Sequence, residues 1–262
     1  MKKYLNLYIL IFFSVSLSLS AFDIKYDKDE ILRAMKDELN RSMNELKLET
    51  LDKPYYIAYT LKLRSTSSIK SILGSVVDSG SFNFASMNVE VRVGDYKLDN
   101  SNFFDVGLGF FGSADDEEVF KNRRLPFELS YNVIRRELWL ATDAAYKQNS
   151  EIYSKKLSVM QNRIRKDTIP DFTKVEPAKN YIFNDFPKFD MIKNAELLNK
   201  LSAILKAFPE INSSSVSMEY LPEVTFYVNS EGMEYVNSEY YTGLEAAVFQ
   251  NHSLRASLPL TS

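Results

Sequence analysis

Apolar residues that recur at steps of three and four predict an amphipathic helix near the start of the chain. This helix covers residues 27–48, and Ile31 and Met35 belong to its apolar face. Asp27 is placed to cap it, with Glu30 three residues later in the capping-box position.

The same periodicity predicts two further helices. One is capped by Ser130 and runs towards Lys166, with its apolar stripe broken near Gln148. At a rise of ~1.5 Å per residue, an unbroken helix of this length would be longer than a small domain is wide. We therefore expect it to break, or to pack against something outside the domain. The other helix is capped by Asn194 and ends at Phe208.

Stretches that alternate with period two, or are rich in branched and aromatic residues, predict strands. They are Tyr55–Leu63, Ile69–Asp78, Met87–Val93, Ser215–Met218, Val224–Val228, Met233–Val236 and Leu244–Phe249. Gly94-Asp95 is a tight-turn pair, so residues 87–98 are expected to form a hairpin that includes Tyr96–Leu98. Residues 229–232 predict a four-residue turn in which Gly232 has positive φ.

These elements predict one α+β domain over residues 22–262, with a mixed or antiparallel sheet and long amphipathic helices. The segment 169–190 contains Pro170, Pro177 and Pro187 and reads as an extended linker, which makes it the candidate sub-boundary of the domain.

Residues 1–21 have the layout of a secretory signal peptide. A basic start is followed by an apolar stretch and by small residues, with cleavage expected after Ser20 or Ala21. The alternative is an uncleaved N-terminal anchor. The chain is therefore expected to be exported to the periplasm or the extracellular space, with no membrane segment after signal cleavage.

Composition excludes several classes of function. The 262 residues include 32 Lys and Arg against 35 Asp and Glu, a net charge of -3 that is not typical of a nucleic-acid-binding domain. There is no Cys and only one His, so a Cys nucleophile, a Cys-based zinc site and a metal site with two His ligands are excluded. His252 has no Gly-x-Ser-x-Gly elbow to accompany it, which argues against a Ser-His-Asp triad.

Two polar stretches of the chain need an interpretation. Residues 99–125 contain Gly107, Gly109 and several phenylalanines, and are the candidate partner-facing loop, with an ordinary surface loop as the alternative. A basic cluster on the second half of the long helix is interpreted as a solvated face. Its members are Lys155, Lys156, Arg163, Arg165 and Lys166.

Short motifs in a fixed order carry a resemblance to a known family. They are Arg41-Ser42-Met43, Glu45-Leu46, Pro54-Tyr55-Tyr56-Ile57, Val91-Arg92-Val93-Gly94-Asp95-Tyr96, Leu98-Asp99-Asn100, Arg135-Arg136-Glu137-Leu138-Trp139-Leu140-Ala141-Thr142-Asp143, Ala145-Tyr146-Lys147, Ile169-Pro170-Asp171-Phe172 and Asn229-Ser230-Glu231-Gly232. Together, over residues 27–249, they resemble the N-terminal half of secreted members of the TldD/PmbA family, metallopeptidase-related proteins once labelled modulators of DNA gyrase.

The resemblance implies a mixed α/β N-terminal domain that a β-rich domain follows. In the TldD-type partner it implies a zinc site on His-Glu-x-x-x-His, downstream of the matched stretch, whose Glu acts as general base. The PmbA-type partner lacks this motif, and the two types pair around a shared peptide-holding cavity. No zinc ligand maps onto this chain, so we predict no catalytic, cofactor-binding or metal residue in it. The expected chain is a shortened, split or stand-alone N-terminal half.

The leading hypothesis is an exported, non-catalytic TldD/PmbA-like domain, the peptide- or partner-binding half of a proteolytic assembly. The partners this implies are a TldD/PmbA-type chain, a peptide, or further copies in an oligomer. The alternative is a stand-alone exported binding or scaffold domain with no proteolytic role. A carboxylate-based hydrolase also stays open, since 35 acidic residues neither reveal nor exclude a catalytic pair.

The candidate binding residues lie at the ends of the two predicted hairpins. For each of them the alternative role is to stabilise a turn. They are Arg92, Asp95, Asp99 and Asn100 at the first hairpin, and Asn229, Glu231 and Gly232 at the second.

Overall fold

The computed structural model describes residues 26–48, 52–103, 123–126, 129–161, 169–250 and 256–257. They form a single sheet with the strand order β3-β2-β1-β5-β6-β4, and β7 pairs with β6. Its strands are β1 (Pro54–Ile72), β2 (Ser75–Val93), β3 (Arg123–Leu125), β4 (Lys179–Ile182), β5 (Ile211–Asn229), β6 (Glu234–Gln250) and β7 (Ala256–Ser257). The described helices are α1 (Lys28–Glu45), α3 (Tyr131–Met160) and α4 (Met191–Ile204), which a 3-10 turn over Leu205–Ala207 follows.

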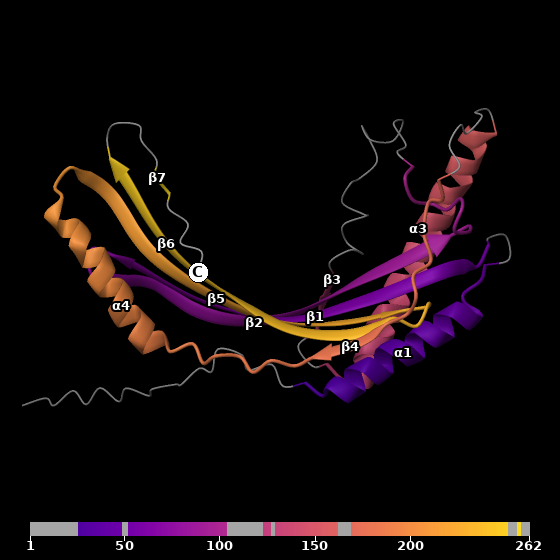
Figure 1. Ribbon diagram of the computed structural model, residues 1–262, viewed down its shortest axis with the longest axis horizontal. Helices are drawn as coiled ribbons and strands as arrows, with labels where there is room; N and C mark the ends of the chain where they lie inside the picture. The colour runs from indigo at the N-terminus through magenta and orange to yellow at the C-terminus, as the bar shows by residue number, and fades with distance from the viewer. Residues whose placement is uncertain are drawn as a thin grey trace, which may run out of the picture.

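The predicted α+β class with a mixed sheet is confirmed. Strand β4 runs parallel to β6, and every other described pair of neighbours is antiparallel. Figure 1 shows the sheet as a strongly curved band, with α4 along its outer side at one end and α1 along its outer side at the other. The predicted signal segment, the phenylalanine-rich part of the loop at 104–122, residues 162–168 and His252 lie outside the described residues.

Strands β1 and β2 form one long hairpin. The prediction of a strand over 69–78 is wrong, because Leu73 and Gly74 both adopt positive φ there and turn the chain. Each strand is 19 residues long, far longer than its apolar part. The second half of β1 is not evident from the sequence, because serines occupy several of its core-side positions. Two of them, Ser67 and Ser71, are fully buried.

Strands β5 and β6 form a second long hairpin. The four strands predicted between residues 215 and 249 are therefore parts of two continuous strands. Pro222 stands between the two predicted parts of β5, and the pairing of β5 with β1 is interrupted there, between Arg64 and Ser67 of β1. A proline cannot donate a ladder hydrogen bond, so it occupies the interruption while the β5–β6 pairing continues past it. The predicted turn at 229–232 is confirmed, and Gly232 has a φ of +95°.

Alternate side chains of the central strands build the core under the helices. Ile57, Leu61 and Leu63 are fully buried and pack with Ile31 of α1 and Leu138 of α3. At the other end of the same face, Ile69 and Val216 pack with Leu198 of α4 in a second cluster. All three described helices therefore cover one face of the sheet, and the opposite face carries the other half of the side chains.

The helix caps differ from the sequence predictions in three places, the first being Ser130, which stands at the N-cap of α3 but makes no side-chain capping hydrogen bond. Asp27 caps α1 as predicted, accepting from the backbone N of Asp29 and Glu30. Glu30, however, does not complete a capping box, because its Oε1 accepts from the backbone N of Tyr131, 2.8 Å away, at the start of α3. For α4 the cap is Asp190 rather than Asn194, and its carboxylate accepts from the N of Ile192 and Lys193.

Helix α3 is continuous over its 30 described residues, so of the two alternatives a break of the helix is not observed within them. The polar residues that interrupt the apolar stripe pack against the edge of the sheet. Asn149 Nδ2 donates to the carbonyl of Val91 at 2.8 Å, and Ser150 is buried. A polar break in the stripe thus marks a contact with backbone rather than an end of the helix.

Candidate functional site

The seven candidate residues meet at one end of the sheet, where the chain leaves β2. Strand β2 ends at Val93, Gly94 has a φ of +107°, and Gly94 and Asp99 form an isolated bridge. The tight turn is therefore confirmed, but residues 96–98 form no strand. Only glycine fits at 94, because a Cβ would lie 2.4 Å from the carbonyl oxygen of Leu98.

Asp95 and Asn100 serve this turn. Asp95 Oδ1 accepts from the backbone N of Lys97 at 2.7 Å and of Leu98 at 2.9 Å. Asn100 Oδ1 accepts from the N of Val93 at 2.8 Å, at the outer edge of β2. Both side chains replace strand hydrogen bonds that the chain gives up as it turns.

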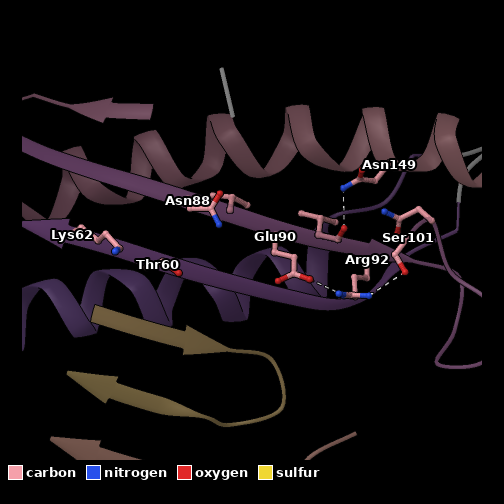
Figure 2. Close-up of a pocket in the computed structure, with 10 residues that line it drawn as sticks. Thr60, Lys62, Asn88, Glu90, Arg92, Ser101 and Asn149 are labelled. Atoms are coloured by element: carbon pink, nitrogen blue, oxygen red, sulfur yellow. Dashed lines mark hydrogen bonds and ion pairs between the residues drawn. The ribbon is translucent and has the colours of Figure 1, made fainter. Parts of the chain in front are cut away.

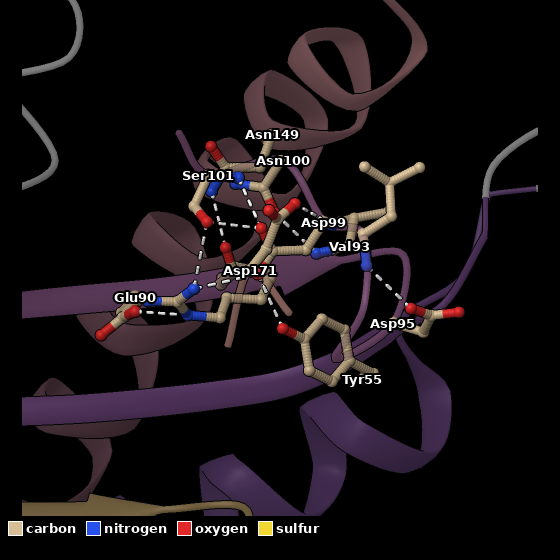
Figure 3. Close-up of polar contacts among 12 residues, drawn as sticks. Tyr55, Glu90, Val93, Asp95, Asp99, Asn100, Ser101, Asn149 and Asp171 are labelled. Carbon is tan, nitrogen blue, oxygen red and sulfur yellow. Dashed lines mark hydrogen bonds and ion pairs between the residues drawn. The ribbon is translucent and has the colours of Figure 1, made fainter. Parts of the chain in front are cut away.

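Asp99 is the centre of a polar cluster, shown in Figure 3, and its side chain is fully buried. One carboxylate oxygen accepts from the hydroxyl of Tyr55 at 2.7 Å and from Arg92 Nη1 at 2.9 Å. The other accepts from the backbone N of Ser101 at 2.7 Å and from its hydroxyl at 2.5 Å. Burial alone would raise the pKa of Asp99, but the hydrogen bonds from Ser101, Tyr55 and Arg92 outweigh it and lower that pKa.

Lys156 joins this cluster from α3, which the sequence did not predict. The basic cluster was interpreted as solvated, yet Lys156 is only 5% exposed. Its Nζ donates to the carbonyls of Asp99 and Ser101 at 2.7 and 2.6 Å, and to Asp171 Oδ2 at 2.5 Å. Asp171 Oδ2 also accepts from the backbone N of Asp99 at 3.0 Å. The solvated interpretation is wrong for Lys156, because three oxygens replace its water.

The second turn carries the remaining candidates. Asn229 Oδ1 accepts from the N of Glu231 and Met233, at 3.1 and 2.9 Å, as its predicted turn role requires. Glu231 Oε1 accepts from the hydroxyl of Tyr96 at 2.6 Å, and this bond raises the pKa of Tyr96 to about 12. Thus Tyr96 connects the turn after β2 to the turn between β5 and β6.

An aromatic group fills the space between the two turns. Phe172 stacks on Tyr96 with ring centroids 6.1 Å apart, and the guanidinium carbon of Arg92 lies 3.9 Å from the centroid of Phe172. Tyr56 contacts Phe172 edge to face at 4.9 Å. The sequence analysis missed Tyr55, Tyr56, Lys156, Asp171 and Phe172 as members of the cluster. The signal was available for four of them, because they belong to motifs that carry the family resemblance.

A groove of about 610 Å³ lies beside this cluster, along β1 and β2 (Figure 2). Most of its lining residues are polar, and the charged groups among them are already paired. Arg92 Nε contacts Glu90 at 2.7 Å, and Lys62 Nζ contacts Glu223 at 2.9 Å. The lining residues are Thr60, Lys62, Asn88, Val89, Glu90, Val91, Arg92, Asn100, Ser101 and Asn149. This arrangement offers hydrogen bonds, and the Ser101 hydroxyl in the lining donates to the buried carboxylate of Asp99.

The hydrogen bonds of the cluster hold the turn after β2 against the turn between β5 and β6. The polar contacts of Arg92, Asp95, Asp99, Asn100 and Asn229 described above are all made within the chain. Ligand binding by these residues stays a prediction. In the described part of the chain, no three His, Cys, Asp or Glu side chains lie close enough together to hold a metal ion. Among the described helices, none is long and apolar enough to cross a membrane.

Comparison with known proteins gives fold neighbours alone. No protein-family model matches the sequence, and no curated protein matches it. A candidate modulator of DNA gyrase from Bacteroides thetaiotaomicron aligns with a TM-score of 0.46 and 11% identity, over 88% of this chain and 42% of that one. A candidate modulator of DNA gyrase from Thermotoga maritima aligns with a TM-score of 0.45 and 9% identity, over 86% and 41%.

TldE from Thermococcus kodakarensis is similar with a TM-score of 0.40 and 11% identity, over 86% of this chain and 41% of that one. The chain thus spans less than half the length of each of these three solved structures.

Proposed function

We propose that this chain is a non-catalytic domain that binds an extended polypeptide segment as an added strand on β6. In the fuller form of the proposal, it is exported and forms the peptide- or partner-binding half of a metallopeptidase-related assembly of the TldD/PmbA type. The ordered motifs shared with that family support the assembly. The outer edge of β6, which has no strand partner among the described residues over positions 239–246, supports the binding mode, and this observation carries the proposal.

Among the described residues, no strand pairs with the outer edge of β6 over the middle of its length. Strand β5 pairs with β6 from Glu234 to Gln250, but β4 covers only residues 234–237 and β7 only residues 247–248. Between them, no described strand pairs with residues 239–246. Such an edge presents a row of backbone donors and acceptors that can take up another strand.

The direction of those backbone groups follows from contacts at one end of β6. The N of Glu234 donates to the carbonyl of Ala178, and the carbonyl of Ser238 accepts from Asn184 Nδ2, so both residues turn their backbone groups to the outer edge. These groups alternate along a regular strand. Tyr240, Thr242 and Leu244 therefore also face outward, and none of them has a described backbone partner on that side.

The side chains around this edge favour a polypeptide partner. Tyr240 and Tyr241 are 50% and 57% exposed and can pack on an added strand. Glu239 and Glu245 are exposed and flank the free stretch. Their carboxylates favour a segment with basic side chains and disfavour a second copy in the register centred on Thr242, which would place Glu239 opposite Glu245 of that copy.

A proline at the edge tests this mode without breaking the sheet. In Thr242→Pro the outward N–H is lost, while the hydrogen bonds that β6 makes to β5 through its odd-numbered residues remain. The probe is fluorescently labelled, reduced and alkylated lysozyme, which is unfolded and basic, and binding is read by anisotropy. We expect saturable binding by the native chain, and a loss of about tenfold in Thr242→Pro, as for one or two hydrogen bonds.

The matched control is Thr242→Ser, which keeps the N–H and should bind as the native chain does. Equal binding by Thr242→Pro, or no binding by the native chain, would contradict the proposal. The alternative is a stand-alone scaffold. It is favoured by the cluster at Asp99, in which both carboxylate oxygens already accept hydrogen bonds from within the chain. It predicts that affinity capture from the native source recovers no peptidase with a His-Glu-x-x-x-His helix, whereas the proposed assembly predicts that it does.

A further inference from the structure

A groove between α1 and α3 lies on the helical side of the sheet, away from both features described above. It has a volume of about 330 Å³ and is lined by Glu38, Arg41, Asn132, Arg135, Arg136 and Trp139. We propose that this groove is an interaction surface for an acidic segment of a partner polypeptide. The proposal does not depend on strand addition at β6, because it concerns other residues on another face.

The buried carboxylate of Glu38 orders the groove. Glu38 is 2% exposed, and its Oε1 accepts from Arg41 Nε at 2.9 Å while its Oε2 lies 3.3 Å from Arg135 Nη2. Ser42 also donates to it, at 3.4 Å. Two guanidinium groups from two helices are thereby held side by side. Arg135 Nη1 also donates to the Tyr131 hydroxyl at 3.2 Å, and the N–H groups that remain on the two arginines can donate to a second carboxylate.

The positive charge of the groove exceeds the negative charge of its own carboxylates. Arg41 lies 3.7 Å from Glu45 at the rim as well as beside Glu38. Arg136 is exposed and has no carboxylate partner among the described residues. The neighbouring acids on α3 are engaged elsewhere, Glu137 with Arg123 and Asp143 with Lys147. Arg136 thus leaves a surplus cation in a protein whose net charge is -3.

Trp139 supplies an apolar contact next to this cation. It lies one helical turn after Arg136, is 46% exposed, and has the guanidinium carbon of Arg41 6.0 Å from its ring centroid. Trp and Arg are among the residue types most enriched at the energetic centres of protein interfaces. The acidic overall charge disfavours a nucleic-acid backbone, which needs an extended basic surface. A short acidic segment with an apolar residue fits the groove instead.

The experiment uses a property of the whole chain: Trp139 is its only tryptophan, so its fluorescence reports this groove alone. The full chain is titrated with an acetylated heptapeptide that has three glutamates on each side of one leucine. The control peptide has glutamines in place of the glutamates. We expect a saturable change of Trp139 emission with the glutamate peptide, absent with the glutamine peptide, and lost at about 1 M salt, where the Debye length is about 3 Å.

The decisive variant is Arg136→Gln, which should weaken binding about threefold, as for one exposed ion pair. The matched control is Arg124→Gln. Arg124 is an exposed residue of β3, where its strand partner is Ser86 of β2, and it lies outside the groove. This control should leave the affinity unchanged, and circular dichroism checks that both variants fold. The proposal would be overturned if the glutamate peptide gave no change of Trp139 emission, or if the glutamine peptide gave the same change. It would also be overturned if Arg136→Gln bound the glutamate peptide as tightly as the native chain does. Tighter binding of single-stranded DNA than of the peptide would overturn the choice of a polypeptide partner.

Discussion

The hydroxyl of Tyr96 donates a 2.6 Å hydrogen bond to Glu231, across 135 residues of sequence. This bond connects the turn after β2 to the turn between β5 and β6, and Phe172 stacks on Tyr96 beside it. Because β1 lies between β2 and β5 in the sheet, the two turns meet only when the central strands have paired. The bond is therefore a marker of the assembled end of the sheet.

Tyr96→Phe tests this marker through the dependence of stability on pH. The bond to Glu231 raises the pKa of Tyr96 to about 12 in the folded chain, from 10.0. A raised pKa contributes stability that is fully present below about pH 10 and is lost as pH rises towards 12. We expect the native chain to lose stability across this window and Tyr96→Phe to lose less, measured by urea unfolding at pH 8 and pH 11. Identical losses in both proteins would contradict the assignment.

Asp99→Asn tests the buried carboxylate at acid pH. The pKa of Asp99 is lowered in the folded chain, so its contribution is present above the unfolded value of 3.8 and is lost as pH falls through the folded pKa. At pH 7 we expect Asp99→Asn to be less stable by about 3 kcal/mol, because Arg92 loses the buried one of its two carboxylate partners and keeps only Glu90. The difference should shrink as pH falls below 3.8, and urea unfolding at pH 3 and pH 7 measures it. A pH-independent difference would show that the charge of Asp99 plays no part.

Lys156→Met tests the contact between α3 and the turn. The variant leaves Asp171 without its ammonium partner and leaves the carbonyls of Asp99 and Ser101 without a donor. We expect a loss of about 3 kcal/mol in the free energy of unfolding. Lys147→Met on the same helix is the matched control, since its pair with Asp143 is exposed, and its cost should stay within about 0.5 kcal/mol. Equal costs would show that the burial of Lys156 contributes nothing.

Much of the fold could be predicted from local pattern, because α1 and the apolar parts of β1 and β2 carry regular periodicity. The extensions could not, because serines occupy the core side of β1 around Ser67 and leave no apolar alternation to read. In α3 the polar Asn149 interrupts the apolar stripe, yet its amide donates to a backbone carbonyl of β2. Local periodicity reports burial by apolar groups and does not report burial by hydrogen bonding.

The sequence predicted which residues lie at the two turns, but it did not predict that the two turns lie in contact. Each turn can be read locally from Gly94, Asp95 and Asn229. That the two turns meet depends on the pairing of β1 with β5, which joins residues as far apart as Ala58 and Asn229 and has no local signature. Lys156 has no such signal, because it stands among basic residues that are typical of a solvated helix face.

Metal analysis tests the non-catalytic part of the proposal. No zinc ligand set is expected in this chain, so the purified full chain should contain far less than one zinc per chain and should not cleave unfolded polypeptides. The measurement is elemental analysis after dialysis with zinc, together with a peptidase assay with and without added zinc. Zinc at one per chain with accompanying hydrolysis would contradict the non-catalytic assignment.

The most direct test of the central claim is amide hydrogen exchange along β6, resolved by residue with NMR. In the free chain, the outward amides of Tyr240, Thr242 and Leu244 should exchange fast, while the intervening Tyr241 and Gly243, paired to β5, should exchange slowly. Adding unfolded lysozyme should protect the three outward amides. Outward amides already protected in the free chain, or left unprotected when the polypeptide is bound, would contradict strand addition at this edge.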